Sequence, residues 1–143
     1  LGVFAADPNF ELLEGYLVRK MSRNPPHDGT LDLLEGAILP LLAGGDWFIR
    51  TQRAVALPDS KPEPDLVIVR GPRNRYRQTH PTSAEVGLLV EVADSSRPID
   101  RGDKVRVYGR AGVTVYWVVS VPDRTIEVYT DPTGPADESG YRQ

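Results

Sequence analysis

The sequence contains no cysteine and no long apolar run. Without cysteine, the chain can form no disulfide, no thiolate nucleophile and no cysteine-ligated zinc site. A chain without cysteine also suits a reducing compartment, so we expect a cytoplasmic protein. No segment approaches the ~20 apolar residues that a membrane-crossing helix needs, and the first residues lack the basic region of a signal peptide. We therefore expect no membrane partner.

An excess of positive charge is also lacking. The 17 Lys and Arg are outnumbered by 20 Asp and Glu, which gives a net charge of −3. Proteins that bind duplex DNA usually carry a basic balance or a basic face, so only a local patch could serve here. One basic segment contains an aromatic residue: Arg70, Arg73, Arg75, Tyr76 and Arg77. Arg73 and Arg75 are candidate phosphate contacts, although a solvated charged loop explains the segment equally well.

The length of 143 residues fits a single domain spanning residues 1–143. Proline and glycine divide it into short elements. We expect two short strands around a turn at Glu14 and Gly15, and a helix that Pro40 kinks or ends. The expected elements are strands within 10–20, a loop at 24–29, a helix at 30–42, strands at 47–57, 66–69 and 86–92, a helix at 98–111, and hairpin strands at 113–121 and 125–129. Residues 131–143 are expected to form a loose or truncated tail. This order predicts a mixed sheet with helices packed on it.

Three charged residues stand where a charge needs a partner. Asp65 precedes the apolar strand at 66–69, and Glu91 lies within the most apolar strand of the chain. Helical spacing places Lys104 on the same face as Val107 and Tyr108, which should meet the sheet. Burying a lone carboxylate costs several kcal/mol, so each acid should be paired, protonated or bound to a metal.

Strand pairing can bring these three residues together. If the strands at 66–69 and 86–92 pair antiparallel, Asp65 and Glu91 meet at one end, and the following helix can return Lys104 to it. Two carboxylates with a backbone carbonyl suit Mg²⁺ or Mn²⁺, and a neighbouring lysine can position water and stabilise a phosphate. The alternatives are a strand-entry cap for Asp65 and a structural ion pair between Glu91 and Lys104.

Several segments form a distinctive succession along the chain. They are 10–18 (FELLEGYLV), 63–69 (EPDLVIV), 89–97 (LVEVADSSR), 100–104 (DRGDK), Tyr108, 111–113 (AGV) and 116–119 (YWVV). With these segments the chain resembles the Uma2 family, a bacterial group of restriction-endonuclease-like proteins. The resemblance implies a fold of the PD-(D/E)XK nuclease class, which is an α/β (α+β) domain with a mixed β-sheet flanked by helices. It also implies metal-dependent hydrolysis of nucleic acid, with DNA favoured over RNA.

The resemblance also implies roles for individual residues. Asp65 and Glu91 become metal ligands, and the backbone carbonyl of Val92 becomes the third by analogy with the class. The class pattern Glu-x-Lys is not met, because Ala93 stands where the lysine is expected. The resemblance assigns that lysine to Lys104, so the expected catalytic set is Asp65, Glu91 and Lys104. Cleavage of both strands of a duplex would favour a homodimer.

Other residues are weaker candidates. Glu11 and Glu14 could add a carboxylate, and His27 could contact a phosphate or transfer a proton, although turn and helix-entry roles explain them as well. Ser95 and Arg97, just after Glu91, are candidate phosphate contacts. The alternative function is a non-catalytic module that retains the fold and binds nucleic acid or a protein.

Overall fold

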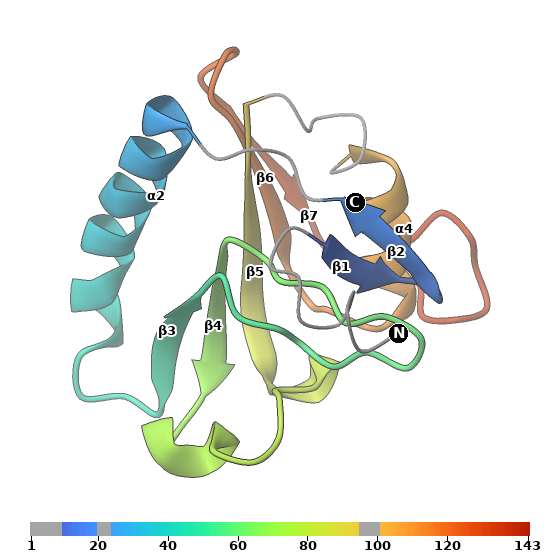
Figure 1. Ribbon diagram of the computed structural model, residues 1–143, viewed down its shortest axis with the longest axis horizontal. Coiled ribbons are helices and arrows are strands. Elements are labelled where there is room, and N and C mark those ends of the chain that lie inside the picture. The colour runs from blue at the N-terminus through green and yellow to red at the C-terminus, as the bar shows by residue number, and fades with distance from the viewer. Residues whose placement is uncertain (1–9, 20–23, 95–100) are drawn as a thin grey trace.

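The computed structural model describes residues 10–19, 24–94 and 101–143. A mixed five-stranded sheet lies at its centre, in the order β3-β4-β5-β6-β7 (Figure 1). The strands are β3 (Trp47–Thr51), β4 (Leu66–Arg70), β5 (Val86–Ala93), β6 (Tyr116–Ser120) and β7 (Thr125–Tyr129). Only β5 and β6 pair in parallel, while the other neighbours are antiparallel. The predicted mixed sheet is therefore confirmed.

A separate antiparallel hairpin comes first in the chain, formed by β1 (Phe10–Leu13) and β2 (Tyr16–Arg19). Its turn residues Glu14 and Gly15 have φ values of 49° and 83°. Two successive positive φ angles are typical of the tight turns that suit the strand twist, and the predicted turn is confirmed.

Helices cover both faces of the sheet. On one face, α2 (Pro25–Ile38) buries Leu31 and Ile38 against Leu66 of β4 and against β5. On the other face, α4 (Asp103–Arg110) packs its apolar side against Val67, the next residue of β4. Burial on both faces explains why β4 and β5 are uniformly apolar rather than alternating. Short 3₁₀ helices, η1 (Leu39–Leu42), η2 (Arg73–Tyr76) and η3 (Ser83–Glu85), complete the described elements.

The predicted loop at 24–29 is wrong, because α2 already begins at Pro25. The Asn24 side chain accepts a hydrogen bond from the His27 backbone N–H at 3.0 Å, and prolines occupy the first helical positions. Both features stabilise a helix start, since proline costs nothing where the N–H groups have no helical partner. The α-helix ends at Ile38, shortly before Pro40, and continues only as η1. The predicted break at Pro40 is therefore confirmed.

Two predicted strands are too long, and the start of one predicted helix is not described. The strand expected at 47–57 ends at Thr51, because Gln52 adopts a φ of 55° and its N–H turns to the carbonyls of Pro64 and Asp65. The second strand pair begins later than expected, at Tyr116. The helix expected at 98–111 is described from Asp103 to Arg110, and its expected start lies outside the described residues.

The expectation of a loose tail after Asp131 is also wrong. Tyr141 is buried, and its hydroxyl donates a hydrogen bond to the Val113 carbonyl at 2.7 Å. A β-carbon added at Gly109 of α4 would overlap the Gly140 carbonyl, so the two backbones are in close contact. One buried aromatic side chain therefore fixes a segment whose proline, glycine and aspartate content suggested disorder.

Candidate active site

The antiparallel pairing of β4 and β5 brings Asp65 and Glu91 together, as expected. Leu66 pairs with Val90, so the preceding Asp65 comes beside Glu91. The Asp65 N–H donates to Glu91 Oε1 at 3.2 Å, and the Val92 N–H donates to Asp65 Oδ2 at 2.7 Å. Backbone groups of the two strands therefore fix both carboxylates.

Lys104 reaches this pair from α4, across the core. Its Nζ lies 2.6 Å from Glu91 Oε2 and 2.9 Å from Glu11 Oε1. Lys104 is only 7% exposed and Glu91 only 3%, so these charges are paired away from water. The predicted helix face is confirmed, because α4 directs its lysine toward the sheet. Opposite charges at this distance offset the desolvation that burial costs.

Of the two glutamates of the hairpin, only Glu11 joins the cluster. Glu11 is buried, and its Oε2 also accepts a hydrogen bond from the Glu63 N–H at 2.9 Å. Glu14 instead forms ion pairs with Arg106 and Arg110 of α4. The hairpin is therefore tied to α4 at two separate points, one buried and one partly exposed.

Tyr108 is a member of the cluster that sequence reasoning missed. Its hydroxyl donates a hydrogen bond to Glu91 Oε2 at 2.8 Å. Burial raises the pKa of this phenol well above its usual value, and the negative charges of Glu91 and Glu11 raise it further. The hydroxyl therefore stays protonated and remains a donor. The four-residue spacing from Lys104 was the available signal, but a tyrosine on an apolar helix face is more often a core residue.

His27 contacts the cluster from the first turn of α2. Its Nε2 lies 3.1 Å from Asp65 Oδ1, and its Nδ1 lies 3.0 Å from Asp28 Oδ1. The hydrogen bond to Asp65 raises the pKa of His27 to about 9, against the opposing effect of burial. At neutral pH the ring is therefore a cation paired with Asp65.

The His27–Asp65 pair is expected to stabilise the metal-free protein in a pH-dependent way. The folded pKa of about 9 lies above the unfolded value of 6.5, so the folded state holds more protons between these values. The stabilisation is complete below about pH 6.5 and is lost as the pH rises through about 9. We expect a contribution of at most about 3 kcal/mol. Urea unfolding of the wild type and His27→Gln, with chelator present, measures it. A difference in unfolding free energy that stays constant up to about pH 10 would contradict the prediction.

Two of the remaining candidates, Arg73 and Arg75, do not reach the cluster. Arg73 and Arg75 lie in η2, beyond the far end of β4 from Asp65. Ser95 and Arg97 lie outside the described residues.

The ligand atoms of the cluster are of the chemical type that a hard divalent cation prefers. Asp65 and Glu91 supply carboxylate oxygens, which Mg²⁺ and Mn²⁺ prefer. In an extended strand the N–H and C=O of one residue point to the same side, so the Val92 carbonyl faces the Asp65 side as its N–H does. Among the described residues, however, no three His, Asp or Glu side chains are arranged as a ready metal-binding group.

A mixed sheet between helices, with this cluster on one face, is a nuclease-like fold. The chain belongs to the Uma2 family, described as "Putative restriction endonuclease", whose model matches residues 3–143. The resemblance seen in the sequence is thereby confirmed. None of the helices in the described ranges is long and apolar enough to span a membrane.

Solved structures support the same fold. The chain is similar to the crystal structure of a protein from Anabaena variabilis described as "a putative nuclease belonging to DUF820". The TM-score is 0.64 at 14% sequence identity, and the match covers 87% of this chain and 78% of that chain. A comparison with curated proteins gave no match.

Proposed function

We propose that the protein is a divalent-metal-dependent nuclease that hydrolyses phosphodiester bonds in nucleic acid, with DNA as the preferred substrate. The observation that carries this proposal is the convergence of Asp65, Glu91 and Lys104 from β4, β5 and α4. Buried ion pairs contribute little net stability compared with apolar side chains of similar size. A cluster of such groups is therefore better explained by chemistry than by folding. Membership of a family described as "Putative restriction endonuclease" supports the same conclusion.

Asp65, Glu91 and the Val92 carbonyl would hold Mg²⁺ or Mn²⁺. When bound, such an ion lowers the pKa of water and polarises the phosphoryl oxygen. The Lys104 ammonium, fixed beside Glu91, would orient the attacking water and offset the negative charge that develops on the phosphate.

Three further residues would act as positioning residues. Glu11 holds Lys104, Tyr108 holds Glu91, and His27 holds Asp65, each through a contact of 2.8 to 3.1 Å. These contacts matter because each catalytic side chain must already be held near its working geometry before the substrate binds.

Calorimetry with Mn²⁺ tests the proposal. We expect the wild type to bind the ion, and Asp65→Asn to weaken binding at least about tenfold, because it removes one carboxylate ligand. Glu14→Gln is the matched control, because this acid lies on the same hairpin but forms its ion pairs, among the described residues, with Arg106 and Arg110 outside the cluster. Absence of Mn²⁺ binding by the wild type, even with an oligonucleotide present, would contradict a metal-dependent activity.

One observation favours the rival function, a non-catalytic module with the nuclease fold. The Glu91 oxygens already accept from Lys104, Tyr108 and the Asp65 N–H, so the cluster is well satisfied by the protein alone. A structural cluster of this kind needs no ion. The two functions differ in their response to Mn²⁺, and the same titration separates them.

A further inference from the structure

Positive charge is concentrated in one region of an otherwise acidic chain. Residues 47–80 contain seven of the 17 Lys and Arg but only three of the 20 Asp and Glu. This region comprises β3, β4, η2 and their connections. Because the rest of the chain is strongly acidic, a polyanion would be steered toward this region and away from the remainder.

The arginines here are held against aromatic rings. The guanidinium of Arg73 lies 5.1 Å from the Phe48 ring centre, and Arg50 and Arg75 lie 5.3 Å and 6.0 Å from that of Tyr76. We call these five residues the arginine–aromatic surface. Stacking fixes the guanidinium plane and leaves its N–H edge available, and that edge matches a phosphate group in a bidentate manner.

Two of these arginines have no acidic partner within the described ranges. Arg75 pairs with Glu85 at 2.9 Å, whereas Arg50 and Arg73 form no ion pair with any described carboxylate. The Arg50 Nη1 atom is buried without a hydrogen-bond partner in this part of the chain. The charges of Arg50 and Arg73 are therefore not neutralised by a described carboxylate and can attract an anion from outside.

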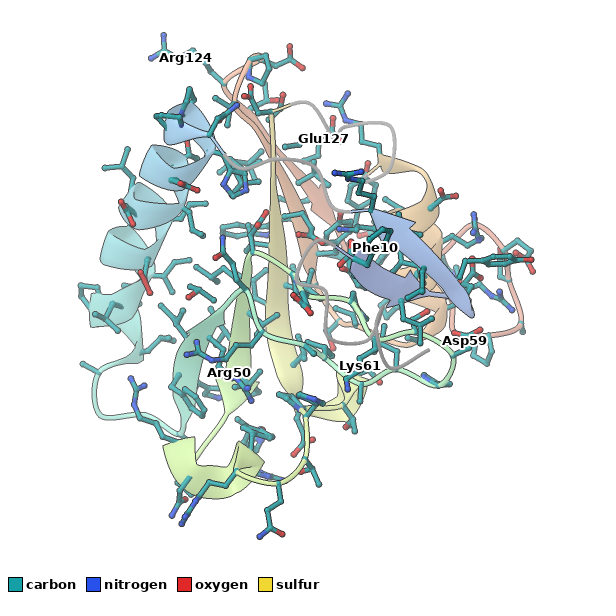
Figure 2. All side chains as sticks on the ribbon, viewed as in Figure 1. Phe10, Arg50, Asp59, Lys61, Arg124 and Glu127 are labelled. Atoms are coloured by element: carbon teal, nitrogen blue, oxygen red, sulfur yellow. The ribbon has the colours of Figure 1, made fainter. Side chains whose placement is uncertain are left out.

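The arginine–aromatic surface lies on the same sheet face as the carboxylate cluster. Phe48 and Tyr76 pack against the core that contains Tyr108, whose hydroxyl contacts Glu91. Arg50 pairs in register with Val67, two residues after Asp65, or about 7 Å along the strand. Arg50 is labelled on β3, beside β4, in Figure 2.

The distance from Asp65 to the far end of the surface fits a nucleic-acid strand. The η2 helix follows the five residues of β4, which span about 17 Å. Since successive nucleotides of a duplex rise about 3.4 Å along its axis, the path from Asp65 to η2 corresponds to about five base steps.

We propose that the arginine–aromatic surface binds the phosphodiester backbone of a nucleic-acid strand that passes from the Asp65–Glu91 cluster toward η2. This inference rests on the proposed function, because the bound strand is the one that the cluster would cut. Arginine contacts to phosphate position a strand without reading its bases, so the surface sets the path of the substrate and not its sequence.

Fluorescence anisotropy with a labelled oligonucleotide tests the proposal, in chelator so that cleavage is absent. The double variant Arg50→Gln/Arg73→Gln is expected to bind at least about tenfold more weakly than the wild type. The slope of log affinity against log salt should fall by about 1.5 to 2, because two phosphate contacts are lost. The control Arg124→Gln/Arg142→Gln removes the same charge from exposed residues outside β3, β4 and η2, and should change affinity less than about threefold.

Several outcomes would overturn the proposal: no binding by the wild type, equal binding by the Gln variant, or displacement of the oligonucleotide by polyglutamate at equal charge. The last would indicate an acidic protein partner.

If the Gln variant does not fold, the variant Arg50→Lys/Arg73→Lys provides a second test, because it keeps the charge. It should preserve the salt slope while weakening binding, because lysine lacks the planar fork.

Mn²⁺ calorimetry distinguishes failure of this inference from failure of the proposed function. The Arg50→Gln/Arg73→Gln variant should bind Mn²⁺ as the wild type does, while Asp65→Asn should lose Mn²⁺ but retain oligonucleotide binding in chelator. Loss of Mn²⁺ binding in the arginine variant would overturn the assignment of these residues to strand binding alone.

Discussion

Asp65→Asn is expected to lower metal-dependent cleavage of DNA at least about 10³-fold, which corresponds to about 4 kcal/mol of transition-state stabilisation. The substitution removes one negative charge but keeps an oxygen that can accept the hydrogen bond from the Val92 N–H. The fold should therefore survive while the ion loses a ligand. Glu91→Gln is a less clean test, because Lys104 and Tyr108 both depend on that carboxylate.

Initial rates on plasmid and oligonucleotide substrates, with Mg²⁺ and with Mn²⁺, measure the effect. Glu14→Gln should cleave at the wild-type rate, because its ion pairs with Arg106 and Arg110 lie apart from the cluster. If Asp65→Asn and the wild type cleave equally, the activity comes from another site or from a contaminant. If the wild type cleaves no substrate yet binds oligonucleotides, the non-catalytic module becomes the better account.

The core of the candidate site could be predicted because its signals are local. A carboxylate inside an apolar strand and a lysine on an apolar helix face are both visible from residue spacing alone. Antiparallel pairing of two neighbouring strands then leaves one way for Asp65 and Glu91 to meet. Because the helix that carries Lys104 follows Glu91 closely in the sequence, it can bring Lys104 back beside Glu91.

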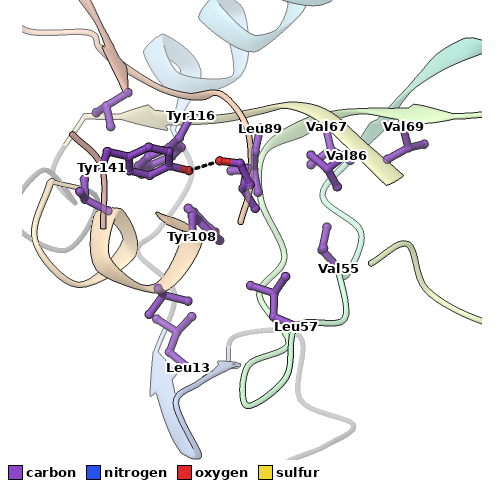
Figure 3. Packing of buried hydrophobic residues seen from close by; sticks show 14 of the residues in the cluster. Leu13, Val55, Leu57, Val67, Val69, Val86, Leu89, Tyr108, Tyr116 and Tyr141 are labelled. Atoms are coloured by element: carbon purple, nitrogen blue, oxygen red, sulfur yellow. Dashed lines mark hydrogen bonds between the residues drawn. The ribbon is translucent and has the colours of Figure 1, made fainter. Parts of the chain in front are cut away.

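The missed parts depend on contacts between distant segments. Glu11 meets Lys104 only because the first hairpin packs beside α4 (Figure 1), and nothing in the hairpin sequence shows where it docks. Tyr108 reads as a core residue, and it is one: Figure 3 shows it among the buried side chains. Its hydroxyl becomes part of the site because Glu91 lies within reach.

The basic segment shows that nearness along the chain does not mean nearness to the cluster in space. Arg73 and Arg75 follow Asp65 by eight and ten residues, and an extended strand carries them to the other end of the sheet. Arg50 is much closer to Asp65, although it precedes Asp65 on another strand. The pairing of β3 with β4 brings it there, and that register is not apparent from either strand alone.

Lys104→Met is expected to lower the free energy of unfolding by about 3 to 5 kcal/mol in chelator at neutral pH. The substitution keeps an unbranched side chain, shorter by one heavy atom, but removes the only cation that contacts both Glu11 and Glu91 among the described residues. Two buried acids would then lose the cation that contacts both of them, so the charged form of each becomes less favourable. Urea unfolding followed by circular dichroism measures the loss.

The same experiment separates the charge effect from a packing effect. Adding Glu11→Gln and Glu91→Gln to Lys104→Met removes the two negative charges as well, while the amide oxygens can still accept from Glu63 N–H and Tyr108. We expect this triple variant to recover to within about 2 kcal/mol of the wild type, because a neutral cluster of similar size costs little.

Arg106→Met is the control on the same helix. It breaks a partly exposed ion pair with Glu14 and should cost less than about 1 kcal/mol. If Lys104→Met costs no more than Arg106→Met, or if the triple variant is less stable than Lys104→Met, the stability comes from packing at this point and not from the pairing of buried charges.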